Sequence, residues 1–240
     1  MKRLKEKAEK INISLTDDQI RQFQTYYELL IEKNKVMNLT AITELEDVIT
    51  KHFLDSLALA EIYPDIANPN SHYEILDLGT GAGFPGLPLK IAFPHLEITL
   101  MDSLNKRVKF LQEVIDALKL TGIHAVHARA EEAARNKEYR EHFDLCVSRA
   151  VANLSTLSEY CIPFVKVGGN FISYKASEIE EEAEKAKKAI QVLGGKLVEI
   201  RKITLPDTDL ERSFVIIEKA KNTPKSYPRK AGTASKEPIK

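Results

Sequence analysis

The stretch from Tyr73 to Leu89, YEILDLGTGAGFPGLPL, constrains the fold of this chain more than any other. An apolar run ends at Asp77, glycines follow at positions 79, 81, 83 and 86, and apolar residues then recur at helical spacing. A buried strand, a tight glycine turn and a helix in this order are typical of the start of a nucleotide-binding α/β sheet. Because glycine has no Cβ and tolerates positive φ, a ligand can lie against the backbone of such a turn. We therefore predict that this glycine loop binds a nucleotide-like ligand.

The residues around the glycines indicate which nucleotide binds. No lysine follows Gly86, so the loop lacks the Gly-Lys-Ser/Thr sequence that holds the phosphates of ATP or GTP. The segment from Gly81 to Gly86 fits the dinucleotide pattern G-x-G-x-x-G, which keeps a nicotinamide cofactor as an alternative. Asp77, however, would repel a pyrophosphate and attract an ammonium group. The spacing also resembles the loop of S-adenosylmethionine-dependent methyltransferases, so we predict S-adenosylmethionine contacts at Asp77, Gly79, Gly81 and Gly83.

A second acidic residue supports a bound nucleoside. The run from Ile98 to Met101 predicts a second strand that ends at Asp102. A carboxylate about 20 residues past such glycines typically binds ribose hydroxyls, which both candidate cofactors carry. Asp102 is thus a predicted ribose ligand, and the choice between the two cofactors depends on Asp77.

The rest of the chain predicts the fold class. Strands and helices alternate, and a short loop then joins predicted strands at 197–200 and 214–217. Such a loop is too short for a crossover helix and favours an antiparallel pair. We predict an α/β, Rossmann-like doubly wound sheet of seven strands with the last strand antiparallel, as in class I methyltransferases. Ligands bind at the carboxyl ends of strands in such sheets. The residues predicted at these ends are Asp77, Asp102, Ala130, Glu131, Arg149 and Lys175.

The predicted parts of the chain are an N-terminal helical extension at 1–67, a methyltransferase domain at 68–220 and a basic C-terminal tail at 221–240. In the extension, Thr16 with Gln19 and Thr43 with Glu46 predict two helix-capping boxes. The chain as a whole is neutral, with 35 Lys and Arg against 35 Asp and Glu, which argues against a globally basic nucleic-acid binder. Phosphate contacts are therefore expected from local basic segments such as the tail, for which a role in solubility is the alternative.

Composition also bears on metals and on location. The sequence contains no apolar run long enough to cross a membrane and no recognisable signal peptide, so we expect a cytoplasmic protein with no membrane partner. Its two cysteines, Cys146 and Cys161, lack the spacing of a metal site, so no metal is expected. Cys146 lies in a predicted apolar strand and Cys161 has no obvious activating neighbour, so neither is a predicted nucleophile.

Several motifs together resemble one family. They are LDLGTGAGFPGLPL, Asp102-Ser103-Leu104, Ser148-Arg149-Ala150, Tyr174-Lys175, Glu211-Arg212, Asn38-Leu39-Thr40, His52-Phe53-Leu54-Asp55-Ser56 and the tail sequence YPRKAGT. Over about residues 25–240 the chain resembles the small-subunit ribosomal RNA guanine-N7 methyltransferases, also called the glucose-inhibited division protein B family. The resemblance implies methylation of guanine N7 in the decoding region of 16S ribosomal RNA, with that RNA, the small ribosomal subunit or an assembly particle as partner. It implies S-adenosylmethionine contacts at Gly79, Phe84, Asp102, Ser103, Leu104, Ala130, Glu131 and Arg149. We expect a monomer.

The implied chemistry agrees with the residues present. Guanine N7 carries a lone pair and no proton, so it needs no general base, and alignment of the reactants can supply about 7–11 kcal/mol. The sequence also lacks the Asn/Asp-Pro-Pro-aromatic loop that methylation of an exocyclic amine usually requires. We therefore expect catalysis by proximity, and we assign no residue with certainty to a catalytic role. Because guanine N7 and O6 accept a fork from Arg or Lys, Lys175 and Arg212 are the candidates for contact with the base.

Some roles stay open at this point. Arg149 could pair with Glu131 or Asp102 instead of binding the cofactor, and Arg212 could be a charge that protects an edge strand. Tyr26 is expected to pack within its helix. An RNA-binding or assembly factor without methyl transfer is the non-enzymatic alternative. The RNA-binding candidates are Lys175, Arg212, Arg229 and Lys230. His52 and Asp55 share a helix face, and they either line the mouth of the active site or form a surface or interface hydrogen bond.

Overall fold

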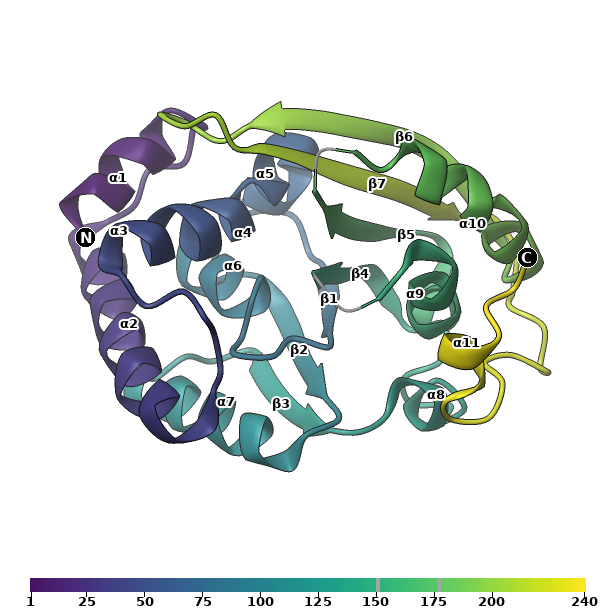
Figure 1. Cartoon of the computed structure of the whole chain (residues 1–240). Helices are drawn as coiled ribbons and strands as arrows, with labels where there is room; N and C mark the ends of the chain where they lie inside the picture. The colour runs from purple at the N-terminus through teal and green to yellow at the C-terminus, as the bar shows by residue number, and fades with distance from the viewer. Residues whose placement is uncertain (150–151, 177) are drawn as a thin grey trace. The chain divides into compact units, whose positions relative to one another are not determined.

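The computed structural model describes residues 1–149, 152–176 and 178–240 (Figure 1). Its strands are β1 (Glu74–Leu78), β2 (Glu97–Asp102), β3 (Ile123–His127), β4 (Phe143–Arg149), β5 (Val165–Lys175), β6 (Gly195–Thr204) and β7 (Glu211–Lys219). They form a seven-stranded sheet in the order β3-β2-β1-β4-β5-β7-β6. The pairs β1–β4, β2–β3 and β4–β5 are parallel, whereas β7 runs antiparallel to β5. The predicted fold class is confirmed, including the antiparallel strand that follows the short loop.

The chain forms two compact units, which are described separately. The first unit comprises Met1–His72, Thr80–His127 and Thr204–Leu210. The second unit comprises Tyr73–Gly79, Ala128–Ile203 and Glu211–Lys240. The division into extension, methyltransferase domain and tail stays a prediction.

The first unit contains β2, β3 and the N-terminal helices. The long helix α2 buries Phe23, Tyr26 and Leu30, which recur at helical spacing, and it contacts α1, α6 and α7. Helix α7 also buries apolar side chains, among them Phe110 and Leu111. The helices are α1 (Lys2–Glu9), α2 (Asp17–Met37), α3 (Leu45–Val48), a π-helical segment (Ile49–Leu54), α4 (Asp55–Leu57), α5 (Leu59–Ile62), a 3-10 turn (Pro64–Ala67), α6 (Gly86–Ala92) and α7 (Asn105–Leu118).

The first capping box is confirmed at the start of α2. The Thr16 hydroxyl accepts the N–H of Gln19 at 3.2 Å, and the Gln19 side chain accepts the N–H of Thr16 at 2.8 Å. These two bonds satisfy donors that the first helical turn leaves without an intrahelical partner.

The second capping box, predicted at Thr43 and Glu46, is wrong. Helix α3 begins at Leu45, and no described side chain caps its N-terminus. The preceding residues are held in a turn by other groups, because the side-chain oxygen of Asn34 accepts the N–H groups of residues 39 and 40, and the Thr40 hydroxyl accepts that of residue 42. Local side-chain hydrogen bonds of this kind compete with helix formation.

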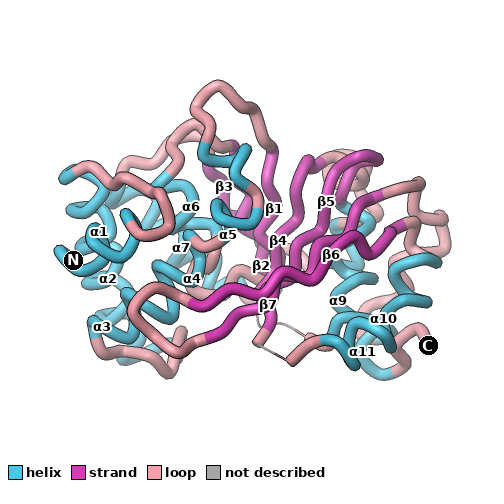
Figure 2. The backbone as a smooth tube through the Cα atoms, turned by 90° about the horizontal axis from the view of Figure 1, so that it is seen from above, coloured by secondary structure: helices cyan, strands magenta, loops and turns pink. Residues whose placement is uncertain are grey.

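The second unit contains β1, β4, β5, β6, β7 and the helical segments between residues 128 and 240. These are α8 (Ala130–Ala133), α9 (Leu154–Cys161), a 3-10 turn (Ile162–Phe164), α10 (Glu180–Val192) and α11 (Thr233–Lys236). Helix α9 contacts α8, α10 and α11, and Figure 2 shows α9, α10 and α11 grouped together. Both thiols, Cys146 in β4 and Cys161 in α9, are buried, and burial raises the pKa of the Cys146 thiol well above its usual range. A buried thiol of raised pKa is a poor nucleophile, as predicted.

Candidate functional site

The glycine loop of the first unit is a tight turn with one open side. The N–H groups of Gly83 and Phe84 both donate to the carbonyl of Thr80, at 2.9 and 3.0 Å. Gly81 and Gly83 have φ of +63° and +106°, which residues with a Cβ rarely adopt. At Gly81, apart from its two chain neighbours, no described residue has an atom within 4 Å of the place where a Cβ would stand, whereas at Gly83 a Cβ would lie 2.3 Å from Cδ1 of Leu87. The loop therefore presents bare backbone at Gly81 and packs on its own helix at Gly83.

The Asp102 carboxylate joins the glycine loop to the end of β2. One of its oxygens accepts the N–H of Gly81 at 3.0 Å, and the other accepts the N–H of Leu104 at 2.9 Å. The guanidinium of Arg107 lies 3.3 Å from the first oxygen, and Asp102 is 3% exposed. Because a carboxylate offers about four acceptor positions, Asp102 can hold both N–H groups and still accept a ribose hydroxyl. The juxtaposition of Asp102 with the glycines, predicted from their spacing, is present.

The segment after Asp102 is open on its outer side. Ser103 is exposed, and its carbonyl lies 3.1 Å from Nε2 of His127. Leu104 is 43% exposed. Beside a carboxylate that can bind hydroxyls, an exposed apolar side chain offers a surface for the flat apolar part of a nucleoside.

An aromatic cluster supports the glycine loop from the N-terminal helices. The Tyr26 hydroxyl donates to the carbonyl of Ala82 at 2.5 Å, and Tyr26 is fully buried. The Phe84 ring, predicted to touch the cofactor, lies 5.5 Å from the ring of Tyr26 and 6.1 Å from that of Phe53. Tyr26 packs within the core as expected, but its hydroxyl also fixes the loop backbone, which the sequence did not indicate.

His52 belongs to the same cluster. Its ring stacks on Phe84 with centroids 4.4 Å apart, and its Nε2 lies 2.8 Å from the hydroxyl of Thr40. His52 is 8% exposed, and Asp55 in α4 is 3% exposed. The structure thus brings His52 onto the loop residue that the resemblance assigns to the cofactor.

In the second unit the predicted residues lie at the ends of β1 and β4. Asp77 is fully buried in β1, where it pairs in register with Val147, and Gly79 follows with φ of +69°. Arg149 ends β4 opposite Tyr174 of β5. Ala150, part of one quoted motif, lies outside the described residues.

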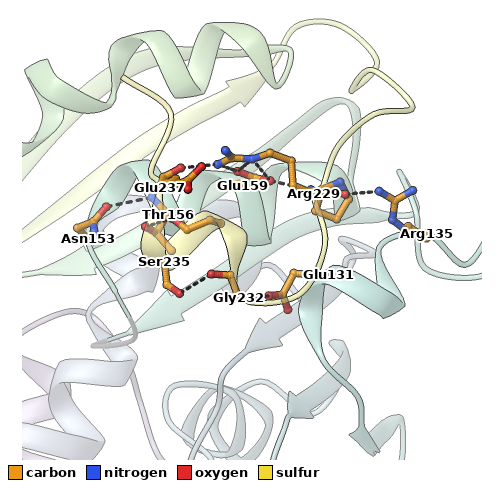
Figure 3. Close-up of polar contacts among 11 residues, drawn as sticks. Glu131, Arg135, Asn153, Thr156, Glu159, Arg229, Gly232, Ser235 and Glu237 are labelled. Atoms are coloured by element: carbon orange, nitrogen blue, oxygen red, sulfur yellow. Dashed lines mark hydrogen bonds and ion pairs between the residues drawn. The ribbon is translucent and has the colours of Figure 1, made fainter.

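Glu131 is the predicted cofactor residue with the clearest partner in the second unit. It belongs to α8, directly after Ala130, and is 8% exposed. One of its carboxylate oxygens accepts the N–H of Gly232 at 2.9 Å, a contact with the C-terminal tail (Figure 3). The alternative pairing of Glu131 with Arg149 stays a prediction.

The basic residues predicted to contact RNA have different surroundings. The Lys175 ammonium donates to the carbonyl of Ala152 and to Glu182, both at 2.7 Å, and its side chain is 14% exposed. One guanidinium N–H of Arg212 donates to the backbone carbonyl before it, at 2.8 Å. Arg229 forms an ion pair with Glu159, whereas Lys230 is exposed. RNA binding by these residues stays a prediction.

Sequence reasoning missed Glu159. It lies in α9 and is 1% exposed, and a buried carboxylate requires hydrogen-bonded partners. The available signal was a lone acid in the otherwise uncharged segment LSTLSEYC. Nothing in the sequence identified its partner, because Arg229 stands 70 positions away.

Two absences concern the part of the chain that the structure describes. No group of three or more His, Cys, Asp or Glu side chains there could hold a metal ion. No helix there is both long and apolar enough to cross a membrane.

Comparison with known proteins identifies relatives over nearly the full chain. The family described as rRNA small subunit methyltransferase G (GidB) matches residues 19–212. A ribosomal RNA small subunit methyltransferase G from Lachnoclostridium phytofermentans is 55% identical over 229 residues, which cover 95% of this chain and 93% of the relative. A protein of the same name from Alkaliphilus metalliredigens is 50% identical over 242 residues, 99% of this chain and 98% of the relative.

Solved structures resemble the fold at low sequence identity. A CurJ carbon methyltransferase has a TM-score of 0.56 at 10% identity and covers 79% of this chain and 61% of that one. M. jannaschii TYW2, solved in complex with AdoMet, has a TM-score of 0.50 at 20% identity and covers 67% of this chain and 75% of that one. At these identities the likeness shows the fold alone.

Proposed function

Because this chain belongs to the rRNA small subunit methyltransferase G family, we propose that it transfers a methyl group from S-adenosylmethionine to N7 of a guanine in the decoding region of 16S ribosomal RNA. The structural observation that carries the proposal is the first unit's glycine loop, whose Gly81 N–H is held 3.0 Å from the Asp102 carboxylate. Bare backbone beside a carboxylate suits a ligand that combines a nucleoside with a compact charged end.

The proposal assigns the donor to two sets of residues. In the first unit, the Asp102 carboxylate accepts ribose hydroxyls, and the exposed side chain of Leu104 covers the base. The remaining first-unit contacts are Gly81, Gly83, Phe84 and Ser103. The second unit is proposed to supply Asp77, Gly79, Ala130, Glu131 and Arg149, with the acids favouring the cationic parts of the donor.

The chemistry asks the protein to align the reactants. When bound, S-adenosylmethionine would supply an electrophilic sulfonium methyl group for the N7 lone pair. No proton leaves N7, so no side chain is required as a general base. The residues of the site act by positioning and by excluding water, which can account for about 7–11 kcal/mol of the barrier.

Contact with the guanine is proposed for Lys175 or Arg212. A cation that donates to O6 orients the base and leaves the N7 lone pair free for attack, so O6 is the suitable acceptor. Lys175 would have to exchange its Glu182 partner for the base, which makes Arg212 the better candidate. Lys230 and the other exposed lysines of the tail are proposed to contact phosphates.

The substrate also bears on location and assembly. We propose that the protein works in the cytoplasm as a monomer, on 16S ribosomal RNA or on a particle that contains it. The three substrate forms to compare are naked RNA, an assembly particle and the complete small subunit.

The decisive experiment maps N7-methylguanosine in 16S ribosomal RNA from cells with and without this protein. Chain cleavage at N7-methylguanosine should appear at one decoding-region guanine only when the protein is present. Purified protein with tritiated donor should label unmodified RNA or subunits at the same nucleotide. Label at another atom, or no label with any of the three substrates, would reject the proposed activity and leave an RNA-binding or assembly role.

Donor binding is tested separately by calorimetry. Gly81→Val places a branched side chain at φ of +63° on the open side of the loop, so S-adenosylmethionine binding should be lost while the fold persists. Unchanged affinity would reject the glycine loop as the binding site, and binding of NADH instead would support the nicotinamide alternative.

A further inference from the structure

The C-terminal tail is fastened to the second unit by groups that grip its backbone. We call residues 223–237 the strap. The Arg140 guanidinium donates to the carbonyls of Thr223 and Tyr227, at 2.8 and 3.0 Å, and Arg135 donates to the carbonyl of Pro228 at 2.5 Å. Because the acceptors are backbone carbonyls, these bonds fix the backbone path of the strap and do not depend on which side chains it carries.

One buried ion pair anchors the middle of the strap. The Arg229 guanidinium makes hydrogen bonds to both carboxylate oxygens of Glu159, at 2.7 to 3.1 Å, and the Arg229 backbone N–H donates to the same carboxylate at 2.7 Å (Figure 3). The Glu159 side chain is 1% exposed and that of Arg229 is 27% exposed. The hydrogen bonds that Arg229 donates to the Glu159 carboxylate raise the pKa of Arg229. Loss of the arginine would leave a buried carboxylate without its charge partner, which is strongly unfavourable.

Beyond this anchor, the strap turns toward Glu131. The turn is made at Gly232, which has φ of +80° and donates its N–H to the Glu131 carboxylate at 2.9 Å. The turn is itself fixed, since the Thr156 hydroxyl of α9 donates to the carbonyl of Ala234 at 3.0 Å and the Ser235 hydroxyl donates to that of Gly232 at 3.1 Å (Figure 3). A backbone N–H in a fixed turn holds the carboxylate in one orientation.

We propose that the strap is a positioning element for the methyl donor, and that Gly232 and Arg229 act on donor binding through Glu131. This inference rests on the proposed function, which assigns Glu131 to S-adenosylmethionine. A carboxylate offers about four acceptor positions, so Glu131 can accept hydrogen bonds from the Gly232 N–H and from an N–H or O–H group of S-adenosylmethionine at once. Because the strap already restricts the Glu131 side chain to few rotamers, less side-chain entropy is lost when the ligand binds.

The same contacts argue against a simple RNA-binding arm. The Arg229 charge is matched by Glu159, and its guanidinium also donates to the carbonyl of Glu237 at 2.9 Å. Lys230, the next residue, is exposed. The two neighbours thus separate the two roles, with Arg229 serving the donor site and Lys230 left for phosphate contact.

The first experiment compares Arg229→Gln with the matched control Lys230→Gln, which makes the same change of charge at the next residue. We expect Arg229→Gln to raise the calorimetric Kd and the KM for S-adenosylmethionine at least tenfold, with the KM for RNA unchanged. Lys230→Gln should leave both donor constants unchanged. A higher KM for RNA with an unchanged donor Kd in Arg229→Gln would overturn the inference and restore the RNA-arm interpretation.

The second experiment is informative even if Arg229→Gln fails to fold. Gly232→Ala and Gly168→Ala introduce the same backbone strain, since the two glycines have φ of +80° and +88° and no described atom lies within 4 Å of either added Cβ. Of the two, only Gly232 contacts Glu131, so only strain at Gly232 should displace the N–H that holds this carboxylate. Gly232→Ala should therefore weaken binding of S-adenosylmethionine roughly fivefold, whereas Gly168→Ala should not, and the two variants should have similar melting temperatures. Equal donor affinities in the two variants would overturn the inference.

Failure of this inference is distinguishable from failure of the proposed function. If the unaltered protein binds S-adenosylmethionine and Gly81→Val does not, the donor site stands whatever the strap variants do. If the unaltered protein does not bind S-adenosylmethionine, the proposed function fails first.

Discussion

The two ends of the chain both support segments assigned to the methyl donor, but by different physical means. In the first unit, the N-terminal helices hold the glycine loop with buried aromatic rings and one hydroxyl, that of Tyr26. In the second unit, the strap is held by arginines on backbone carbonyls and by the buried pair of Glu159 and Arg229. Apolar burial is insensitive to charge state, whereas charged hydrogen bonds depend on it.

The two kinds of support should respond differently when they are lost. The aromatic support is part of the core, so its loss should cost stability together with donor binding. The strap is attached through charged hydrogen bonds, so its loss should cost stability through an unpaired buried charge and not through lost apolar packing.

The largest effect is expected at Gly83. An added Cβ would lie 2.3 Å from Cδ1 of Leu87 and 2.8 Å from the Tyr26 hydroxyl, at φ of +106°. Strain and overpacking together should cost Gly83→Ala about 2–5 kcal/mol of unfolding free energy, measured by urea denaturation. Gly81→Ala, which meets no described atom, should cost only about 1–2 kcal/mol. Equal losses would show that Leu87 and Tyr26 do not restrict the loop at Gly83.

The next largest effect is expected at the buried ion pair. Arg229→Leu should cost about 2–3 kcal/mol of unfolding free energy, less than a fully buried pair because the arginine is partly exposed. The double change Glu159→Leu with Arg229→Leu should cost less than Arg229→Leu alone, since no unpaired buried charge remains. A double variant less stable than the single one would mean that apolar packing, and not charge, fastens the strap.

A smaller effect is expected from the Tyr26 hydroxyl. Tyr26→Phe keeps the ring and removes the bond to Ala82, so it should cost about 1 kcal/mol and weaken donor binding roughly fivefold. The neighbouring hydroxyl of Tyr27 donates to the carbonyl of Thr43 at 3.1 Å in an exposed setting, so Tyr27→Phe is the matched control and should change neither quantity. Full donor affinity in Tyr26→Phe would restrict this residue to packing.

The smallest effect is expected at acid pH, where the attachment of the strap near Glu141 should weaken. Burial alone would raise the pKa of Glu141, but hydrogen bonds from Asn222, Thr223 and Lys219 outweigh it and lower that pKa below its ordinary value. A carboxylate with a lowered folded pKa contributes stability that is present above its unfolded pKa and is lost as pH falls through the folded pKa. On acidification, hydrogen exchange at the start of the strap should therefore accelerate before exchange in α2 does. Glu141→Gln should remove that pH dependence, and its persistence in this variant would assign it to other carboxylates.

The neighbouring ammonium changes stability with pH in the same direction, but over an alkaline interval. Lys219 is fully buried against Glu141, Thr223 and the carbonyl of Ile162, and burial lowers its pKa to about 8. The unfolded chain therefore binds more protons than the folded chain between that value and the ordinary lysine pKa, so this group makes stability rise with pH across that interval. Acid and base responses of the strap attachment can thus be separated by pH.

Much of the fold could be predicted because its signals are local. A strand, a glycine loop and a helix in direct succession admit few geometries, and a short loop between two strands enforces an antiparallel pair. The capping box at Thr16 and Gln19 was predictable for the same reason. The failed box at Thr43 and Glu46 shows the limit, since side chains of Asn34 and Thr40 already held the preceding backbone.

By itself, the sequence determined the sheet, the glycine loop with its acid at Asp102, and the family. Only the tertiary structure decided the partners of Tyr26, Glu131 and Glu159, which lie 56, 101 and 70 positions away along the chain. Periodicity reports which side chains are buried, but a buried polar group can be satisfied by any donor or acceptor that folding brings within about 3 Å. That choice is made by the packing of distant segments, which is why a tail that reads as a free basic arm is instead fastened beside Glu131.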